Sequence, residues 1–270
     1  TAGNIRKYRV TLADMETLPE QFEAWQRYVG LADGTIYRRR RTLARFGAVH
    51  DLAIARPVDI ESWLGQFKQA TTRRQYLGDL RAFYGWALDH DHLTVDPAAR
   101  VRAPKQPLGK PSPIDPDVLK AAIDAAPEPE RTMLILAGFA GLRCVEISRL
   151  RLEDVSHKSG TLRVLGKGDR TRDVTMHPLV AAALPAGTGP AVTFRGKPIT
   201  PRTVSDRLAR YLHGQGIDAT GHKARHSYGT GLYEACHNLV TVAGQLGHAN
   251  IATTRGYVAA SDEDARAAIA

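Results

Sequence analysis

Residues 221–230 read GHKARHSYGT, a stretch in which His222 and His226 stand one helical turn apart. This spacing occurs in metal sites, where two imidazoles on one helical face bind the same ion. Here Lys223 and Arg225 lie between the histidines and the stretch holds no carboxylate, so charge repulsion disfavours a divalent cation. An anion fits better, because His222 and Arg225 are three residues apart and share a face. The alternative is a basic helix face that contacts only solvent.

The overall charge also favours an anionic partner. The 270 residues carry a net charge of +9, with a pI near 9.7, and 43% of them are hydrophobic. This composition is typical of a folded protein with one or two domains whose basic surface binds nucleic acid, although some basic proteins have no such partner. No apolar run reaches the roughly 18 residues of a membrane span, and the N-terminus lacks the apolar stretch of a secretory signal. Two cysteines indicate a reducing compartment, so we expect a cytoplasmic protein.

Hydrophobic periodicity predicts two domains that are mainly α-helical. Four amphipathic helices are expected in residues 15–96, and we assign residues 1–96 to a helical domain. Residues 97–113 contain five prolines and four basic residues without an acid, which predicts an extended basic linker. The rest, residues 114–270, is expected to be mostly helical, with a β-hairpin around the GKGD sequence at residues 166–169. The predicted fold class is therefore mainly α with a small β-hairpin or sheet.

Further polar residues in the second domain could complete a site with His222 and Arg225. Arg143 follows an apolar helix and opens the next one, a position that requires an anionic partner, and Glu146 stands three residues later. Lys167 is placed at the hairpin tip. His248 ends an LGH sequence, and Tyr257 falls on the short helix expected after it.

Taken in order, these residues resemble the pattern of the tyrosine recombinases, or phage integrase family. That pattern is Arg with Glu or Asp three residues on, a hairpin Lys, His-x-x-Arg, Leu-Gly-His, and a Tyr about nine residues later. The resemblance covers roughly residues 112–260, and it identifies the first domain as a core-binding domain and the second as the catalytic domain. The chain departs from the pattern at Ala224, where Leu or Phe is usual, and at Gly229, where Ala is frequent. Both positions concern packing beside the site.

The resemblance implies a role for each of these residues. Tyr257 would attack a DNA phosphate and form a 3′-phosphotyrosine bond, and Lys167 would protonate the departing 5′ oxygen. The remaining predicted catalytic residues would bind the phosphate or assist the tyrosine, with Glu146 holding the geometry: Arg143, His222, Arg225 and His248. Because the phosphotyrosine ester conserves the bond energy, we expect no cofactor and no metal. The implied enzyme is a small phage-type integrase that inserts and excises DNA at attachment sites, or alternatively a Xer-type chromosome dimer resolvase.

Basic side chains of the first domain and the linker are expected to contact DNA phosphates. They are Arg38, Arg39, Arg40, Arg41, Arg73, Arg74, Arg100, Arg102 and Lys105. The implied partners are double-stranded DNA, further copies in a homotetramer, and possible accessory DNA-bending or directionality factors, with no membrane. We expect the segment 261–270 to dock into a neighbouring protomer.

Two other classes share parts of this pattern. A type IB topoisomerase would use the same chemistry but relax DNA without pairing two sites. A non-catalytic DNA-binding protein on this fold would have no use for the complete set of catalytic residues, which argues against it.

Overall fold

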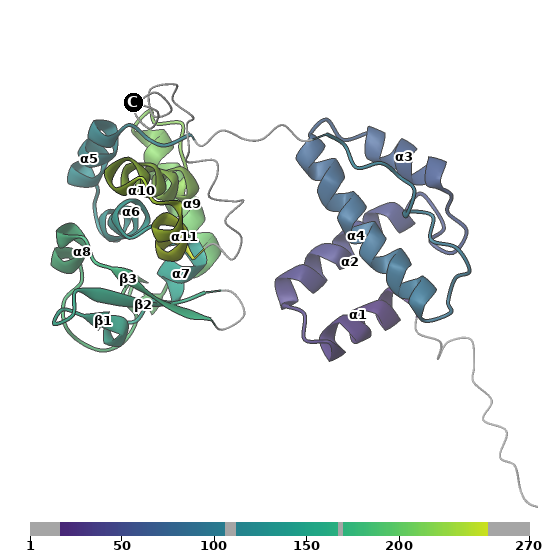
Figure 1. The fold of residues 1–270 in the computed structure, drawn as a ribbon, viewed down its shortest axis with the longest axis horizontal. Helices are drawn as coiled ribbons and strands as arrows, with labels where there is room; N and C mark the ends of the chain where they lie inside the picture. Colours follow the sequence, from purple (N-terminus) through teal and green to yellow (C-terminus); the bar gives the residue numbers. More distant parts are fainter. Residues whose placement is uncertain (1–16, 106–111, 167–169, 248–270) are drawn as a thin grey trace, which may run out of the picture. The chain divides into compact units, whose positions relative to one another are not determined.

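A computed structural model describes residues 17–105, 112–166 and 170–247 of the chain. The chain divides into two compact units, Thr1–Pro107 and Leu108–Ala270 (Figure 1). The described residues are mainly helical, with small antiparallel sheets, as the sequence predicts. None of the helices in these ranges is both long and apolar enough to cross a lipid bilayer.

Residues 17–105, the described part of the N-terminal unit, contain four helices, as predicted: α1 (Leu18–Tyr28), α2 (Asp33–Gly47), α3 (Pro57–Gly65) and α4 (Ala70–Asp89). Helix α1 begins after Thr17, whose backbone N–H donates to the carboxylate of Glu20 at 2.8 Å. Helix α4 contacts the other three helices. The shared core is rich in aromatic side chains that are almost completely buried, namely Phe22, Phe46, Trp63, Phe83, Tyr84 and Trp86.

The chain continues to pack against this unit after α4. Ala98 and Val101, which lie in the stretch predicted to be a linker, are buried in the helical core. Arg81 on α4 donates to both of their carbonyl oxygens, at 3.3 and 2.6 Å, and Arg74 donates to the carbonyl of Pro104 at 2.9 Å. The first part of the basic stretch is therefore held on the helical unit. Its centre, residues 106–111, lies outside the described ranges.

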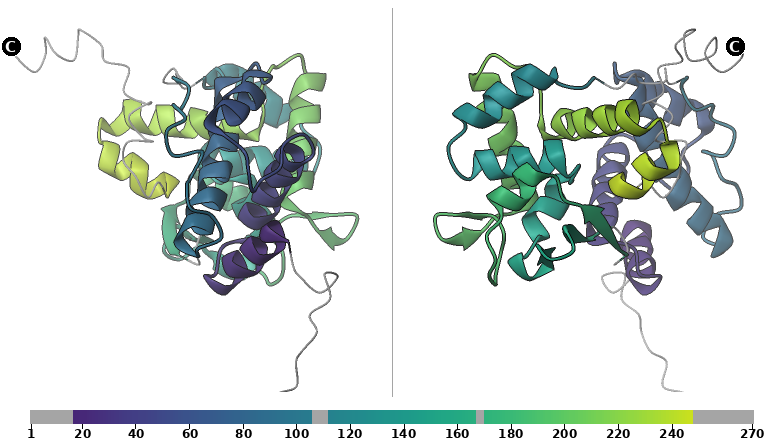
Figure 2. Two further views of the ribbon diagram at one scale, coloured as in Figure 1. Left: turned by 90° about the vertical axis from the view of Figure 1, so that its right-hand side faces the viewer. Right: turned by 60° about the vertical axis from the view of Figure 1, so that its left-hand side comes forward.

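The C-terminal unit surrounds α6 with other helices. Its helices up to residue 247, where the description ends, are α5 (Pro116–Ala125), α6 (Glu130–Phe139), α7 (Cys144–Arg149), α8 (Pro178–Ala183), α9 (Pro201–Gly214), α10 (Gly221–Cys236) and α11 (Leu239–Leu246). Helix α6 is buried over most of its length, as its continuous apolar sequence predicts, and contacts α5, α7, α8, α9 and α10. Helices α10 and α11 lie side by side (Figure 2). Side-chain oxygens of Asp115, Thr200 and Asn238 cap α5, α9 and α11.

A three-stranded antiparallel sheet packs against the helices of this unit. It follows the 3-10 turn Leu152–Asp154 and consists of β1 (Val155–Ser156), β2 (Thr161–Leu165) and β3 (Thr171–Thr175), in that order. The predicted hairpin is therefore confirmed. Across it, Val164 pairs with Arg172 and Leu162 with Val174. Strands β4 (Thr193–Phe194) and β5 (Lys197–Pro198) form a second, two-stranded sheet that the sequence did not predict.

Candidate active site

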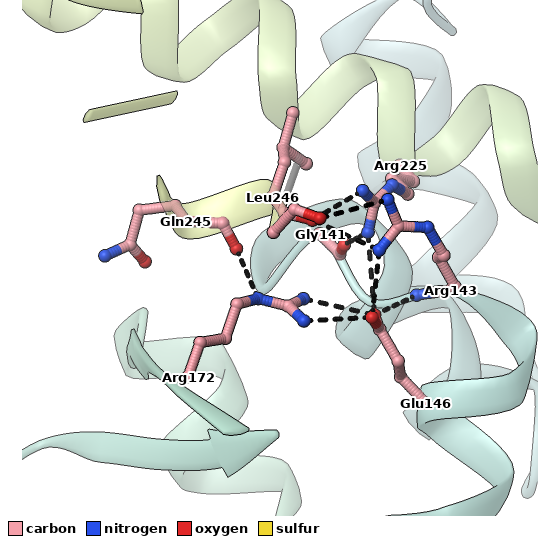
Figure 3. Close-up of polar contacts among 8 residues, drawn as sticks. Gly141, Arg143, Glu146, Arg172, Arg225, Gln245 and Leu246 are labelled. Atoms are coloured by element: carbon pink, nitrogen blue, oxygen red, sulfur yellow. Dashed lines mark hydrogen bonds and ion pairs between the residues drawn. The ribbon is translucent and has the colours of Figure 1, made fainter. Parts of the chain in front are cut away.

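Three arginines from segments far apart in the sequence meet a single carboxylate, that of Glu146 (Figure 3). Arg172 on β3 donates to both of its oxygens, at 2.9 and 3.1 Å. Arg143 donates from Nη1 at 3.0 Å, and Nη1 of Arg225 on α10 lies 3.6 Å from Oε2. The side chain of Glu146 is only 1% exposed, so this carboxylate joins α7, β3 and α10 in the interior.

The local sequence fixes Arg143 and Glu146 relative to each other. Gly141 turns the chain after α6 with φ +63°, and Arg143 takes the extended conformation of a helix N-cap. Its backbone N–H donates to Oε2 of Glu146 at 2.8 Å, because Glu146 is the third residue of α7. A Cβ atom at Gly141 would lie 2.9 Å from Leu246 and closer still to the ring of Tyr228. Glycine is therefore required where this turn meets α10 and α11.

Arg225 is buried and binds two backbone carbonyls. Its side chain is 3% exposed and donates to the carbonyl oxygens of Gly141 and of Leu246, the latter at 2.7 Å. The Leu246 carbonyl also accepts from Arg143 at 3.3 Å. Carbonyl groups in the last turn of a helix have no partner within the helix, so arginines can satisfy them. The end of α11 is thereby bound to the same cluster.

Arg172 is the member of this cluster that the sequence analysis missed. Its Nε donates to the carbonyl of Gln245 at 3.0 Å, in addition to the two bonds to Glu146. A signal for it exists in the sequence. Side chains alternate along a strand, so Arg172 faces the same side as the buried Val174. An arginine on the core side of a strand requires a buried anion or carbonyl.

The cluster carries a net positive charge, and the carboxylate stays ionised. Burial alone would raise the pKa of Glu146, but hydrogen bonds from Arg172 and the Arg143 backbone outweigh burial. Together with the charges of Arg172 and Arg225, they hold the pKa of Glu146 below its ordinary value. The arginines differ in exposure: 39% of the Arg143 side chain reaches solvent, against 14% for Arg172. Arg143 is thus the cation best placed to meet an external anion.

The two histidines of the opening stretch contact each other. Their Nε2 atoms lie 3.1 Å apart, on successive turns of α10. Desolvation and the charges of Arg225 and Arg143 lower the pKa of His222. The pKa of His226 is lowered to about 4, mainly by desolvation and further by electrostatic interaction with His222 and Arg225. Both imidazoles are therefore neutral at pH 7, and each then carries one N–H donor and one acceptor nitrogen.

The predicted catalytic residues are covered only in part by the described ranges. Arg143, Glu146 and Arg225 meet in one cluster, with His222 on the turn of α10 that precedes Arg225. Lys167, His248 and Tyr257 lie outside the described residues. The chain on either side of Lys167 is paired, since the N–H of Gly166 donates to the carbonyl of Arg170 at 2.8 Å.

The predicted DNA-contacting arginines of α2 have unequal surroundings. Arg38 binds the buried Asp79 of α4, at 3.0 and 3.2 Å, and Arg39 donates to Gln26 of α1 at 3.1 Å. These two side chains therefore hold helices together. The Arg38 side chain is nevertheless 43% exposed, and contact with DNA remains a prediction for both residues. It also remains a prediction for the other residues that lie exposed on the surface of the N-terminal unit: Arg40, Arg41, Arg74, Arg100, Arg102 and Lys105. Arg73 is partly buried, and its Nε atom has no hydrogen-bond partner among the residues that the structure describes.

Known proteins resemble this chain in sequence, both over the C-terminal unit and beyond it. Residues 113–264 match the model of the phage integrase family. The tyrosine recombinase XerC of Vibrio parahaemolyticus is 31% identical over 208 residues, which are 70% of this chain and 67% of that protein. XerC of Proteus mirabilis is 34% identical over 197 residues, 66% of this chain and 64% of that protein. The alignments thus span about two thirds of the length of these relatives.

A solved structure shares the fold. The integrase of transposon Tn1549 (residues 82–397), solved in complex with circular intermediate DNA, superimposes with a TM-score of 0.73 at 18% identity. The match covers 95% of this chain and all of that chain. At this identity the likeness concerns the arrangement of the helices and strands.

Proposed function

This chain belongs to the phage integrase family of tyrosine recombinases, and we propose that it cleaves and rejoins duplex DNA at specific sites through a 3′-phosphotyrosine intermediate. The observation that carries the proposal is the cluster of Arg143, Arg172 and Arg225 on Glu146. It presents fixed positive charge close to His222, the predicted catalytic residue one turn before Arg225 on α10. Negative charge grows on the non-bridging oxygens of a phosphate as phosphorus becomes five-coordinate, and preorganised donors stabilise that charge.

Arg143 and Arg225 are the two arginines that we assign to the phosphate. Forked guanidinium donors match phosphate oxygens. The carbonyls of Gly141 and Leu246 restrain the Arg225 side chain, and Glu146 restrains Arg143. Little rearrangement is then required when DNA binds. His248 is the second residue after the end of α11, and we assign it as a further donor to the phosphate.

Proton transfers accompany attack and departure. The hydroxyl oxygen of Tyr257 forms a bond to phosphorus while the bond from phosphorus to the 5′ oxygen breaks. His222, neutral because its pKa is lowered, accepts or orients the phenol proton. Lys167 supplies a proton to the 5′ oxygen. A 5′ hydroxyl from a partner strand then attacks the phosphotyrosine and restores Tyr257, so the reaction requires no cofactor or external energy source.

The proposed partner is double-stranded DNA, contacted by the exposed basic residues of the N-terminal unit. The net charge of +9 supports this assignment. We also propose a homotetramer on two paired DNA sites, in which the segment 261–270 of one protomer docks on the next, and accessory factors that set direction. We expect such an enzyme to be located in the cytoplasm and to act on chromosomal DNA.

Phage-type integration, with insertion and excision at attachment sites, is the reaction we favour. A Xer-type resolvase is the second candidate, because both relatives compared above are XerC proteins. The two differ in their substrates: an integrase joins two different sites, whereas a resolvase recombines two copies of one site.

The test begins by selecting, from a random pool, DNA duplexes that bind the protein. Each selected duplex is then synthesised with a nick beside the cleavage position. The proposal expects a covalent protein–DNA adduct and, on plasmids, products that require two sites. Relaxation of a plasmid that carries a single site, without any two-site product, would instead identify a type IB topoisomerase. Binding without any adduct would identify a non-catalytic DNA-binding protein.

A further inference from the structure

Arg172 has a distinctive place in the cluster around Glu146. It is the arginine that occupies both carboxylate oxygens, at 2.9 and 3.1 Å, in the paired geometry in which guanidinium–carboxylate contacts are strongest. Its Nε is bound as well, to the carbonyl of Gln245. With a side chain only 14% exposed, Arg172 faces the interior of the unit.

The arrangement has a direct consequence for Arg143. The Arg143 side chain donates to one oxygen of Glu146 at 3.0 Å, and its contacts to the carbonyls of Leu246 and Gly247 are longer, at 3.3 and 3.5 Å. If Arg172 were removed, each oxygen of Glu146 would lose a guanidinium donor, and the Arg143 side chain could extend its contact from Oε1 to Oε2. A paired contact would then draw the guanidinium inward, away from the solvent that 39% of its side chain now reaches.

We propose that Arg172 is a positioning residue for strand cleavage: by occupying Glu146 it keeps Arg143 directed outward, toward the phosphate. The inference rests on the proposed recombinase function. Arg172 does not touch the DNA in this account and acts through Glu146. Its bond to the Gln245 carbonyl fixes its own guanidinium in the plane that the carboxylate requires.

The decisive measurement is the single-turnover rate of adduct formation at saturating DNA, together with the dissociation constant for the same duplex. Arg172→Met should slow adduct formation by about 10- to 100-fold, by analogy with residues that orient metal ligands in other proteins, whose loss has an effect of this size. The dissociation constant should change less than about threefold, because the loss falls on the transition state. Arg163→Met is the matched control: Arg163 lies on the same hairpin but faces solvent, so its rate should equal that of the wild type.

A double-mutant cycle separates positioning from a general structural role. If Arg172 acts through Glu146, then Arg172→Met combined with Glu146→Gln should be no slower than Glu146→Gln alone. If the two losses multiply, or if Arg172→Met cleaves at the wild-type rate, the inference is overturned.

A third variant keeps the inference testable if Arg172→Met does not fold. Arg172→Lys retains the charge but cannot bind two oxygens and a carbonyl together, so a folded Arg172→Lys should be slowed by about tenfold. A wild-type rate in that variant would overturn the inference. The proposed function is judged separately, since wild-type protein without any adduct would refute recombination, whereas the Arg172 variants are compared only with an active wild type.

Discussion

Gly247 lies directly against the guanidinium of Arg172. A Cβ atom at Gly247 would approach Nη1 of Arg172 to 2.8 Å, and the glycine has φ +64°, a conformation that costs other residues free energy. A glycine is therefore required at this position of the Leu-Gly-His motif for two reasons. It ends α11 in a left-handed turn, and it leaves room for Arg172, which binds Glu146.

Gly247→Ala should therefore destabilise the fold by about 1–3 kcal/mol, the range found for strained backbone positions. It should also slow cleavage, because Arg172 must move. The matched control is Gly244→Ala, three residues earlier in α11, where a Cβ atom would meet nothing within 4 Å. That change should leave stability unchanged or raise it by up to about 1 kcal/mol. Denaturant unfolding measures the free energy of unfolding of both variants. An equal loss of stability in Gly247→Ala and Gly244→Ala would contradict this interpretation of Gly247.

Arg225→Lys tests whether a forked side chain is necessary at the buried position. A lysine cannot bind the carbonyls of Gly141 and Leu246 and a phosphate in the same geometry. We expect cleavage to fall by about 100- to 1,000-fold, as for the loss of one preorganised donor. Arg202→Lys is the control, since that side chain is 91% exposed on α9. Single-turnover cleavage near the wild-type rate in Arg225→Lys would refute the assignment.

His226 contributes to the pH dependence of the folding stability. Its folded-state pKa of about 4 lies below the ordinary value of 6.5, so the unfolded chain binds more protons between these two values. Stability contributed by neutral His226 is complete above pH 6.5 and is lost as pH falls toward 4. Relative to the wild type, His226→Gln should therefore gain stability as pH falls through this window. Urea unfolding at pH 7.5 and 4.5 measures the change, and the same difference at both values would argue against a lowered pKa.

Arg39 and Arg41 offer a contrast within one helix. Arg39 is 20% exposed and bound to Gln26, so Arg39→Ala should lower the free energy of unfolding by about 1–2 kcal/mol. Arg41 is exposed, and Arg41→Ala should change stability by less than about 0.5 kcal/mol. If Arg41 binds a DNA phosphate, its loss should also reduce the slope of log affinity against log salt by about one. An unchanged slope would show that Arg41 does not bind a DNA phosphate.

Local signals in the sequence were sufficient for most of the elements. The caps of α5 and α9 follow from Asp115 and Thr200, each before a proline, and the GKGD sequence fixes the hairpin. The buried α6 follows from its apolar sequence. These features depend on neighbouring residues, so a single sequence contains the information for them.

Non-local pairings could not be obtained in this way. The partners of Arg172 lie 26 and 73 residues away, and only the folded chain brings them together. The same is true of Arg38 and Asp79, which lie 41 residues apart and form an ion pair between two helices. Strands of two residues, such as β4 and β5, are too short to produce a periodic pattern.

The identity of the nucleophile is the central claim. Tyr228 is the most informative alternative, because it lies on the same helix as Arg225, packs against Val242 and Leu246, and has its pKa raised mainly by burial. The measurement is covalent adduct formation on a nicked duplex by the wild type, Tyr228→Phe and Tyr257→Phe. The account predicts an adduct with the first two proteins and none with Tyr257→Phe. An adduct that persists in Tyr257→Phe would contradict it.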